Sequence, residues 1–387
     1  MSVDEARDSN GKQLALDRLA HLITVGEDLQ TKVIRKAVER VIVDKLVYPK
    51  DTSITVKGKD RILLFRNPEN EEEEGVQVTN HALNQICGVL EIPKIYVNRL
   101  LDDCVGMPES IRHTLLESLF NKHFQHGVFL DRKRHPAKFL QRSMDGKLHA
   151  FLSRSYNRML GTALMMRPFL EECALAGARP TAAFHDALKT TIQCVQPVIY
   201  EPVDGEFVAF GASYVNSDFG AGSLLVCGSV LRVMSGTTSV LESRMKKVHL
   251  GALIKDSDIE LSQETMVKES QAHASAVRDM VREVFSEKNI EETLELVRFS
   301  HEHKISWDKL TGKAKEYLGK AELDMLKELL GRTKDGTVDL PPITVNSLGD
   351  PEANAWWAAA ALGHIATNVV DVERKVSIQE LAGNLLK

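Results

Sequence analysis

The chain lacks the features that mark membrane-spanning, secreted and zinc-bound proteins. In its 387 residues the densest apolar stretch, which starts at Ala355, is too short to span a bilayer. The five cysteines lie far apart and none belongs to a Cys-x2-Cys pair, so we expect reduced thiols and no common structural zinc site. The polar, acidic N-terminus has no apolar core of a secretory signal. We therefore expect a cytoplasmic protein.

Several catalytic signatures are missing as well. No Gly-x4-Gly-Lys-Ser/Thr pattern occurs, which excludes a P-loop NTPase, and no Gly-x-Ser-x-Gly elbow is present. The stretch "GAGSLL" at 220–225 has no third glycine and lies between strand-like segments, so it does not predict a dinucleotide site. The sequence predicts no cofactor and no metal site, and nothing in it commits the chain to catalysis.

What is present at the start of the chain is a block of helical pattern followed by strands. Apolar residues from Leu29 to Leu46 recur at helical spacing, which predicts one helix of about five turns. The arms "TSITV" and "RILLFR" around Gly58 predict a β-hairpin. The acidic run 67–75 is too charged to pack and is interpreted as an exposed loop.

The rest of the chain continues in blocks. Residues 79–126 are helical in pattern, with Thr79 or Asn80 as the first N-cap, and a helix that begins at Pro108 has Ile111, Leu115 and Leu119 on one side. Two strands are expected within 127–160. A hairpin is expected around Asp204-Gly205 in the β-rich part of the chain, 190–235.

The last third of the chain is predicted to be helical. The segment from Asp256 to about Leu330 has an acidic, helical pattern, and a final helix is expected with Asp350 as its N-cap. Blocks of helices and strands that do not alternate predict an α+β fold. We expect three regions: helices and a hairpin at 1–78, a central α+β domain at 79–255, and a mainly helical region at 256–387.

The most unusual segment is the basic stretch from Asp131 to Leu160. It holds eight lysines and arginines against two acids, whereas the whole chain has a net charge of −5. Aromatic residues lie between the cations, which is the composition of surfaces that hold single-stranded nucleic acid, with cations on phosphates and rings on bases. An equally open interpretation is a half-buried strand whose solvated face pairs with the acidic segment 256–302.

Two further features favour the nucleic-acid interpretation. In "RSYNR", Arg154, Tyr156 and Arg158 share a face if the segment is a strand, and "SRMKKVHLG" at 243–251 adds a second basic group. Tyr156 or Phe151 is the expected base-stacking residue. The predicted nucleic-acid-binding residues are Arg132, Lys133, Arg134, Lys138, Arg142, Arg154, Tyr156, Arg158, Arg244, Lys246 and Lys247.

Two alternatives are also open. In the first, Asp218, Ser235 and His249 form a catalytic site around the glycine-punctuated segment, which requires Asp218 and His249 to lie within hydrogen-bond reach. In the second, the chain is an interaction or phage-assembly protein whose basic stretch docks on acidic helices of a neighbouring subunit, as in a homo-oligomer.

Four segments together resemble one family, in their order and spacing. They are "HALNQICGVLEIPKIYVNRL" at 81–100, "LHAFLSRSYNRML" at 148–160, "VNSDFGAGSLLVCGSVLRVMSGT" at 215–237 with "KKVHLG" after it, and "AWWAAAALGHIATNVVDVER" at 355–374. Over about residues 79–375 the chain resembles the phage/plasmid-like family of uncharacterised proteins carried by prophages, phages and conjugative elements. It departs from that pattern at "VMSGTT", where the family has a Cys-Thr/Ser-Asn-Gly turn, and at Asp218, where the family has Glu.

The resemblance carries over no activity residue by residue, but it implies a context. It implies a mobile-element gene product in a bacterial cytoplasm that takes part in DNA maintenance, replication or recombination. With the basic stretch, the expectation is a non-catalytic DNA-binding protein that favours single strands, as in annealing or recombination. The enzyme and the assembly protein are the alternatives.

Overall fold

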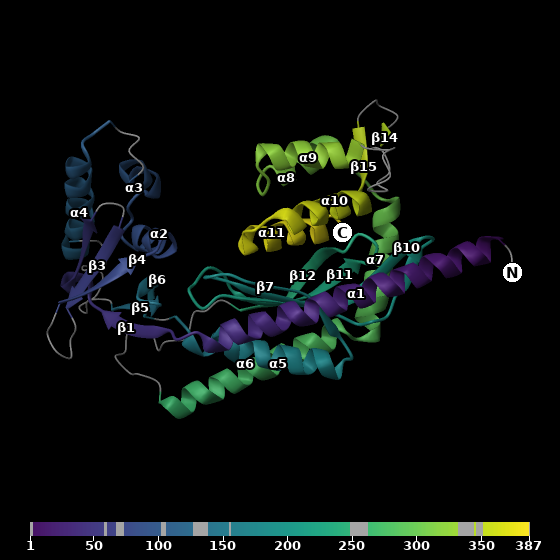
Figure 1. Cartoon of the computed structure of the whole chain (residues 1–387), viewed down its shortest axis with the longest axis horizontal. Coiled ribbons are helices and arrows are strands. Elements are labelled where there is room, and N and C mark those ends of the chain that lie inside the picture. Colours follow the sequence, from purple (N-terminus) through teal and green to yellow (C-terminus); the bar gives the residue numbers. More distant parts are fainter. Residues whose placement is uncertain are drawn as a thin grey trace.

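The structure is a computed structural model that describes residues 3–57, 60–66, 73–101, 106–126, 138–154, 156–247, 262–331, 344–345 and 351–386. It is α+β, as the sequence predicts. A long N-terminal helix leads into two sheets, and a helical region follows (Figure 1). None of the described helices has the length and apolar content needed to cross a bilayer.

The first sheet has six strands in the order β1-β5-β6-β4-β3-β2. Only β4 and β6 are paired in parallel; the other neighbours are antiparallel. The predicted hairpin around Gly58 is confirmed as β2 and β3. The expected division after residue 78 falls inside this sheet, because β4 pairs with β6 from the central region. The strands are β1 (Val43–Val47), β2 (Thr52–Lys57), β3 (Asp60–Arg66), β4 (Glu73–Val78), β5 (Phe139–Met144) and β6 (Lys147–Ser153).

Strand β4 corrects part of the loop prediction. Residues Glu73, Glu74 and Gly75 of the acidic run belong to this strand, where they pair with β3. The carboxylate of Glu74 forms an ion pair with Lys45 of strand β1. Residues 67–72 of the run lie outside the described part of the chain.

Three helices and a short 3-10 turn cover the sheet: α2 (Asn80–Val89), α3 (Lys94–Leu101), α4 (Glu109–His126) and η1 (Pro49–Asp51). Thr79 is the N-cap of α2, as predicted, and its hydroxyl accepts a hydrogen bond from the Ala82 amide at 3.3 Å. The predicted face of α4 is wrong. Ile111 is 50% exposed, whereas Leu116 and Phe120 are buried in the core.

Helix α1 (Val3–Glu39) is longer than predicted at its start and ends earlier. The apolar pattern up to Leu46 continues past the helix because Val43–Val47 is strand β1, paired with β5. In Figure 1, α1 runs alongside β7 (Arg179–His185) and then leads into the first sheet. The approach is close at Gly26, where an added Cβ would lie 2.3 Å from the carbonyl oxygen of Pro180.

The second sheet has the order β12-β11-β10-β8-β7, and β9 pairs with β10. Its printed pairings are all antiparallel. The predicted hairpin turn at Asp204-Gly205 is confirmed between β9 and β10, with φ of +75° at the glycine. The remaining strands are β8 (Thr190–Val195), β9 (Tyr200–Val203), β10 (Glu206–Asn216), β11 (Leu224–Arg232) and β12 (Thr237–Lys247).

Helices cover both faces of this sheet (Figure 1). On one face, α5 (Thr162–Leu175) and α6 (Gln263–Val284) pack against a core that includes Tyr214 and Val226. On the other face, α11 (Val372–Asn384) places Val376 against Cys227 and Val240. Cys227 and Val226 are neighbours on β11, so their opposite placement follows from the alternation of a strand.

The C-terminal region is helical, as predicted, but its last segment begins differently. Helix α10 (Ala355–Asn368) has Asn354 as its N-cap, not Asp350, because Pro351–Asn354 pairs as strand β15 with β13. Trp356 is 3% exposed in the core that these helices share. The other elements are η3 (Arg158–Leu160), α7 (Glu287–Glu302), β13 (Lys304–Ser306), α8 (Trp307–Ala314), α9 (Lys320–Gly331), β14 (Thr344–Val345) and β15 (Pro351–Asn354).

Candidate functional site

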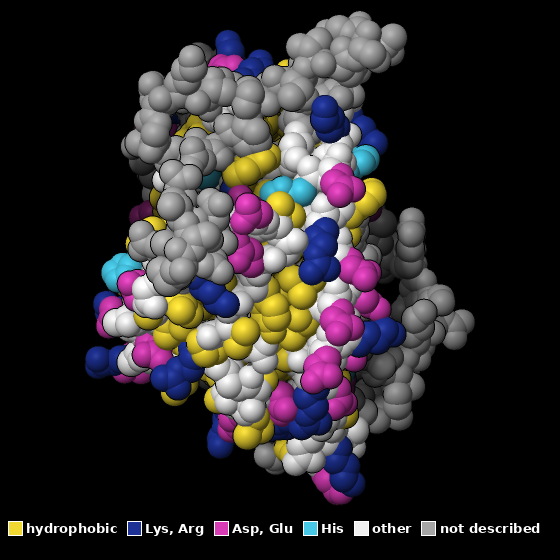
Figure 2. Space-filling model, turned by 90° about the vertical axis from the view of Figure 1, so that its right-hand side faces the viewer, with side chains coloured by type: hydrophobic (Ala, Val, Ile, Leu, Met, Phe, Trp, Pro, Cys, Tyr) yellow, Lys and Arg dark blue, Asp and Glu magenta, His cyan; other side chains and the backbone are white. Residues whose placement is uncertain are grey.

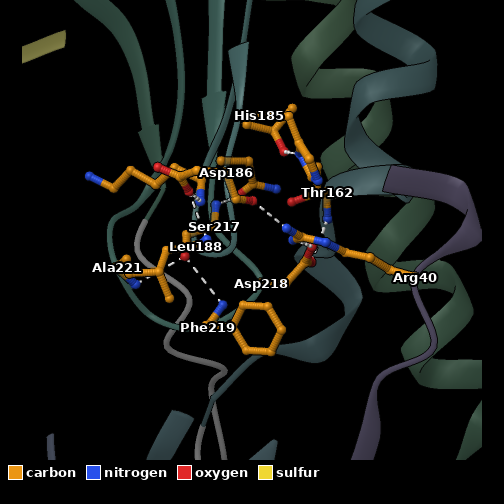
Figure 3. A network of polar contacts seen from close by, with 12 residues as sticks. Arg40, Thr162, His185, Asp186, Leu188, Ser217, Asp218, Phe219 and Ala221 are labelled. Carbon is orange, nitrogen blue, oxygen red and sulfur yellow. Dashed lines mark hydrogen bonds and ion pairs between the residues drawn. The ribbon is translucent and has the colours of Figure 1, made fainter. Parts of the chain in front are cut away.

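Asp218 lies at the junction of the two sheets, in the loop between β10 and β11 (Figure 3). One carboxylate oxygen accepts a hydrogen bond from the Thr162 amide at 2.8 Å. The other lies 3.7 Å from Nη1 of Arg40, and both side chains are 8% exposed. The second arm of Arg40, Nη2, donates to the carbonyl oxygen of Asp186. Both oxygens of Asp218 therefore have partners within the protein.

Arg142 joins the first sheet to the same loop. Its Nε donates to Asp44 at 2.8 Å, and its Nη1 donates to the carbonyl oxygen of Asp218. The residue is 6% exposed. The prediction that Arg142 presents its charge to phosphate is wrong, because strand β5 directs the side chain toward Asp44 on the neighbouring strand β1.

The two predicted stacking residues are buried too. Tyr156 is 8% exposed, its hydroxyl donates to the carbonyl oxygen of Ser217 at 3.0 Å, and burial raises its pKa. Phe151 is 1% exposed and stacks on Phe139 with ring centroids 5.0 Å apart. Neither ring is open to a base. The predicted strand face in "RSYNR" is also wrong, because β6 ends at Ser153 and Arg158 begins η3.

Two histidines at the junction, His149 and His185, have lowered pKa values. Burial and then the charge of Arg40 lower the pKa of His185 to about 4, and its Nδ1 lies 2.8 Å from the Thr190 hydroxyl. Burial, followed by Arg40, lowers the pKa of His149, whose ring centroid lies 5.1 Å from that of Phe219. Both imidazole rings are therefore neutral parts of the junction, in which buried hydrogen bonds such as that from Arg142 to the Asp218 carbonyl connect the two sheets.

The alternative catalytic set is not assembled. Asp218 precedes β11 and Ser235 follows it, and the nine residues of this strand separate its ends by about 30 Å. The Ser235 hydroxyl instead contacts that of Thr237 at 2.8 Å. His249 lies outside the described residues. The prediction that Asp218 and Ser235 share one site is wrong.

The structure describes the side chains of only some of the other predicted phosphate contacts. Arg132, Lys133 and Arg134 lie outside the described residues, and so do the side chains of Arg244, Lys246 and Lys247, whose backbone forms the end of β12. Arg154 is partly buried, and the side chain of Arg158 is 48% exposed with Nη1 3.8 Å from Asp44. Lys138 directly precedes β5 and belongs to a group of residues that the sequence interpretation did not bring together.

Two lysines lie close to the ring of Tyr48, the residue between β1 and η1. Nζ of Lys138 is 5.1 Å from the centroid of its ring, and Nζ of Lys50 is 5.8 Å from it. Within the described part of the chain, neither lysine has an ion pair with a carboxylate. Val47 and Phe139 are the last antiparallel pair of β1 and β5, so the next residues of the two segments, Tyr48 and Lys138, lie opposite each other. We call Tyr48, Lys50 and Lys138 the Tyr48 corner.

The C-terminal end of helix α4 lies near the Tyr48 corner. Helix α4 packs along β2 and η1: Glu117 accepts from the Val56 amide, and Asn121 accepts from the Ile54 amide four residues later. The helix therefore runs toward η1 and ends there at His126. In the sequence, residues 127–137 connect this helix end to Lys138, and they include Arg132, Lys133 and Arg134 of the predicted basic stretch.

The end of the molecule opposite the first sheet has a different distribution of charged side chains. Figure 2 shows the side that carries the start of α1 and the end of the β10 hairpin, opposite the first sheet. Described lysines and arginines lie there among aspartates and glutamates, around a strip of hydrophobic side chains. Among the residues described, charges of both signs are mixed on this face (Figure 2), whereas the two lysines of the Tyr48 corner have no carboxylate partner in the described part of the chain.

Comparisons with known proteins were made for the whole chain. No protein family, curated protein or solved structure matches it. The resemblance to the phage/plasmid-like family stays a prediction.

Proposed function

We propose that the protein binds single-stranded DNA, and that the Tyr48 corner is part of the binding surface. The observation that carries this proposal is one aromatic ring with two lysine ammonium groups over it, neither of which is neutralised by a described carboxylate. This replaces Tyr156 and Arg142 as the centre of the predicted surface, because both are buried.

The chemistry of the corner suits a flexible polyanion. A lysine ammonium over an aromatic ring is held by a weak cation–π contact, worth about 0.5–1 kcal/mol where it is exposed. A phosphate attracts the same ammonium more strongly than the ring does, and the long lysine stem can move toward it. The ring of Tyr48 is then open to stack on a base, as aromatic rings do in single-strand-binding proteins.

The sequence around the corner adds cations to it. Arg132, Lys133 and Arg134 precede Lys138 by only a few residues, and they remain predicted phosphate contacts. The implied context of phage or plasmid DNA metabolism supports DNA as the ligand. The function that follows is a non-catalytic role, such as holding single strands for annealing.

The test is fluorescence anisotropy of a labelled oligothymidine with the full chain. We expect binding at about 50 mM salt that weakens strongly at about 200 mM, since bound phosphates release counterions. The variant Lys50→Ala/Lys138→Ala removes two contacts, so we expect the slope of log affinity against log salt to fall by about 1.4. A duplex of the same length should bind less tightly.

The matched control is Lys309→Ala/Lys313→Ala, which removes two exposed lysines from α8. This variant should bind like the unaltered protein. No binding at about 50 mM salt would refute the proposal, and so would equal losses in the two double variants.

A further inference from the structure

Lys375 is a buried lysine that has no charge partner among the residues that the structure describes. It lies in the first turns of α11 and is 7% exposed. Its Nζ is 3.7 Å from the centroid of the Phe184 ring on β7. The backbone amide donates to Asp371, but the ammonium has no hydrogen bond or ion pair with any residue that the structure describes. Buried lysines are rare unless they are paired, since an unpaired buried charge is costly.

The side chain of Lys375 lines a cavity of about 110 Å³. The cavity lies between α1, the second sheet and the α10–α11 pair, and this volume has room for several waters or one small polyatomic ion. Its polar lining comes from lysine, threonine and glutamine, and none of the described lining residues is an aspartate or glutamate. The polar lining residues used in the argument are Lys375, Gln193, Gln379 and Thr238.

Two hydrogen-bond donors in the wall have no acceptor among the described residues. Gln193 donates from Nε2 to Oε1 of Gln379 at 3.1 Å, which leaves the amide NH2 of Gln379 as a donor. No described residue accepts from that NH2 group or from the hydroxyl of Thr238. With the ammonium of Lys375, the cavity presents a positive charge and two neutral donors to whatever occupies it.

A second cation lies beside the cavity. Gly236 is part of the wall, and Nη2 of Arg18 on α1 lies 3.8 Å from the position that a Cβ of this glycine would take. Arg18 itself is exposed to solvent. Its charge favours the approach of an anion and disfavours a cation.

We infer that this cavity binds one small oxyanion, a phosphate or carboxylate group, which supplies the charge partner that Lys375 lacks. A carboxylate or phosphate oxygen accepts from the ammonium, the Gln379 amide and the Thr238 hydroxyl at once. Such charge-assisted hydrogen bonds are stronger than neutral ones. Burial lowers the pKa of Lys375, and no carboxylate of the described residues offsets this effect, as the charge of a bound anion would. The site is separate from the Tyr48 corner.

The test is isothermal titration calorimetry of the full chain with inorganic phosphate and, separately, with sodium acetate, at ionic strength matched with sodium chloride. We expect one site per chain for at least one of the two anions, and the preferred anion identifies the group. Lys375→Met should weaken this binding at least tenfold. The control Lys309→Met removes an exposed lysine of α8 and should change nothing. Absence of binding to both anions, or equal binding by Lys375→Met, would overturn the inference.

A second measurement needs no substitution. In protein labelled with 13C at the lysine Cε positions, the titration of Lys375 over about pH 8–11 reports its pKa directly. Saturating phosphate or acetate should raise that pKa, because a bound anion favours the charged ammonium. A titration that neither anion moves would contradict the site, even if Lys375→Met failed to fold.

Discussion

Arg40 and Asp218 form a buried ion pair between the end of α1 and the loop that joins β10 to β11, with Nη1 3.7 Å from Oδ2. Burial lowers the pKa of Arg40, and the charge of Asp218 opposes that effect. Asp218 also accepts from the first amide of α5, at Thr162. One carboxylate thus links three segments that are far apart in the sequence.

Removal of this carboxylate should destabilise the protein strongly. Asp218→Ala leaves the guanidinium of Arg40 buried without its charge partner, and we expect a loss of about 3–5 kcal/mol in the free energy of unfolding. Asp218→Asn keeps an acceptor for the Thr162 amide and should cost less. Urea denaturation of the full chain measures both values.

The control for this prediction is Arg167→Ala, which breaks an exposed ion pair with Glu171 on α5. Exposed pairs of this kind contribute little, so its unfolding midpoint should stay unchanged. If Asp218→Ala shifts the midpoint no more than Arg167→Ala does, the junction does not depend on this ion pair.

His185 should make the protein less stable in mild acid. Burial and Arg40 lower its pKa to about 4 in the folded state, whereas the unfolded side chain titrates near 6.5. Between about pH 6.5 and 4 the unfolded chain therefore binds more protons, and stability falls as the pH falls through this window. Because the ring is partly exposed, we expect a contribution of about 1–2 kcal/mol, less than the full shift would give.

The measurement is chemical denaturation of His185→Gln and of the unaltered protein at about pH 7 and 4.5. The variant should lose less stability between the two values, because glutamine does not titrate. His149 and His301 also have lowered pKa values, so part of the acid sensitivity should persist in the variant. Equal losses in both proteins would show that His185 does not contribute.

The fold class and several local elements were predictable, because their signals lie close together in the sequence. The N-cap at Thr79 and the turn at Asp204-Gly205 each depend on a few adjacent residues. The end of α1 was not predictable in this way. Strand β1 is defined by its pairing with β5, almost a hundred residues later, while its own apolar spacing continues that of the helix.

The core-facing side of helix α4 was predicted wrongly because one of its buried residues is an arginine. Its core-facing residues are Arg112, Leu116, Phe120 and Phe124, at a spacing of four. Arg112 donates from Nη1 to the carbonyl oxygen of Leu100, so the charged residue occupies a core position. A search for apolar residues alone therefore selects the adjacent face, with Ile111 and Leu115.

The candidate site depended on contacts that no local pattern contains. Basic charge in 131–160 was visible in the sequence, but Arg142 proved to be paired with Asp44 from a distant strand. Tyr48 gives no signal of its own, because the lysine opposite it is Lys138. Charge counts could indicate a class of ligand, whereas only the pairing of β1 with β5 identified a ring near two lysines that have no described carboxylate partner.

The ring of Tyr48 should contribute to DNA binding independently of its hydroxyl. Tyr48→Phe keeps the aromatic face and should bind an oligothymidine like the unaltered protein. Tyr48→Ala removes the face, and we expect a loss of about 1–3 kcal/mol in the free energy of binding. The backbone at this position is held separately, since the Thr52 hydroxyl donates to the Tyr48 carbonyl oxygen.

Anisotropy titrations at low salt distinguish the two variants, and circular dichroism confirms that both are folded. If Tyr48→Ala and Tyr48→Phe bind equally, the ring does not stack on a base. The two lysines would then be the only contribution of the corner.

Close packing of α1 on the second sheet predicts opposite effects of the same substitution at two helical glycines. In Gly26→Ala the new Cβ would lie 2.3 Å from the carbonyl oxygen of Pro180 and 2.5 Å from Cα of Thr181. Both contacts are backbone atoms of β7, so the helix or the strand must move, at a cost of about 1–3 kcal/mol. At Gly88 in α2 nothing lies within 4 Å of the added Cβ, and alanine should stabilise the helix by about 0.5–1 kcal/mol. Urea denaturation should therefore lower the midpoint for Gly26→Ala and raise it for Gly88→Ala. A rise for both variants would mean that α1 does not lie as close to β7 as the structure places it.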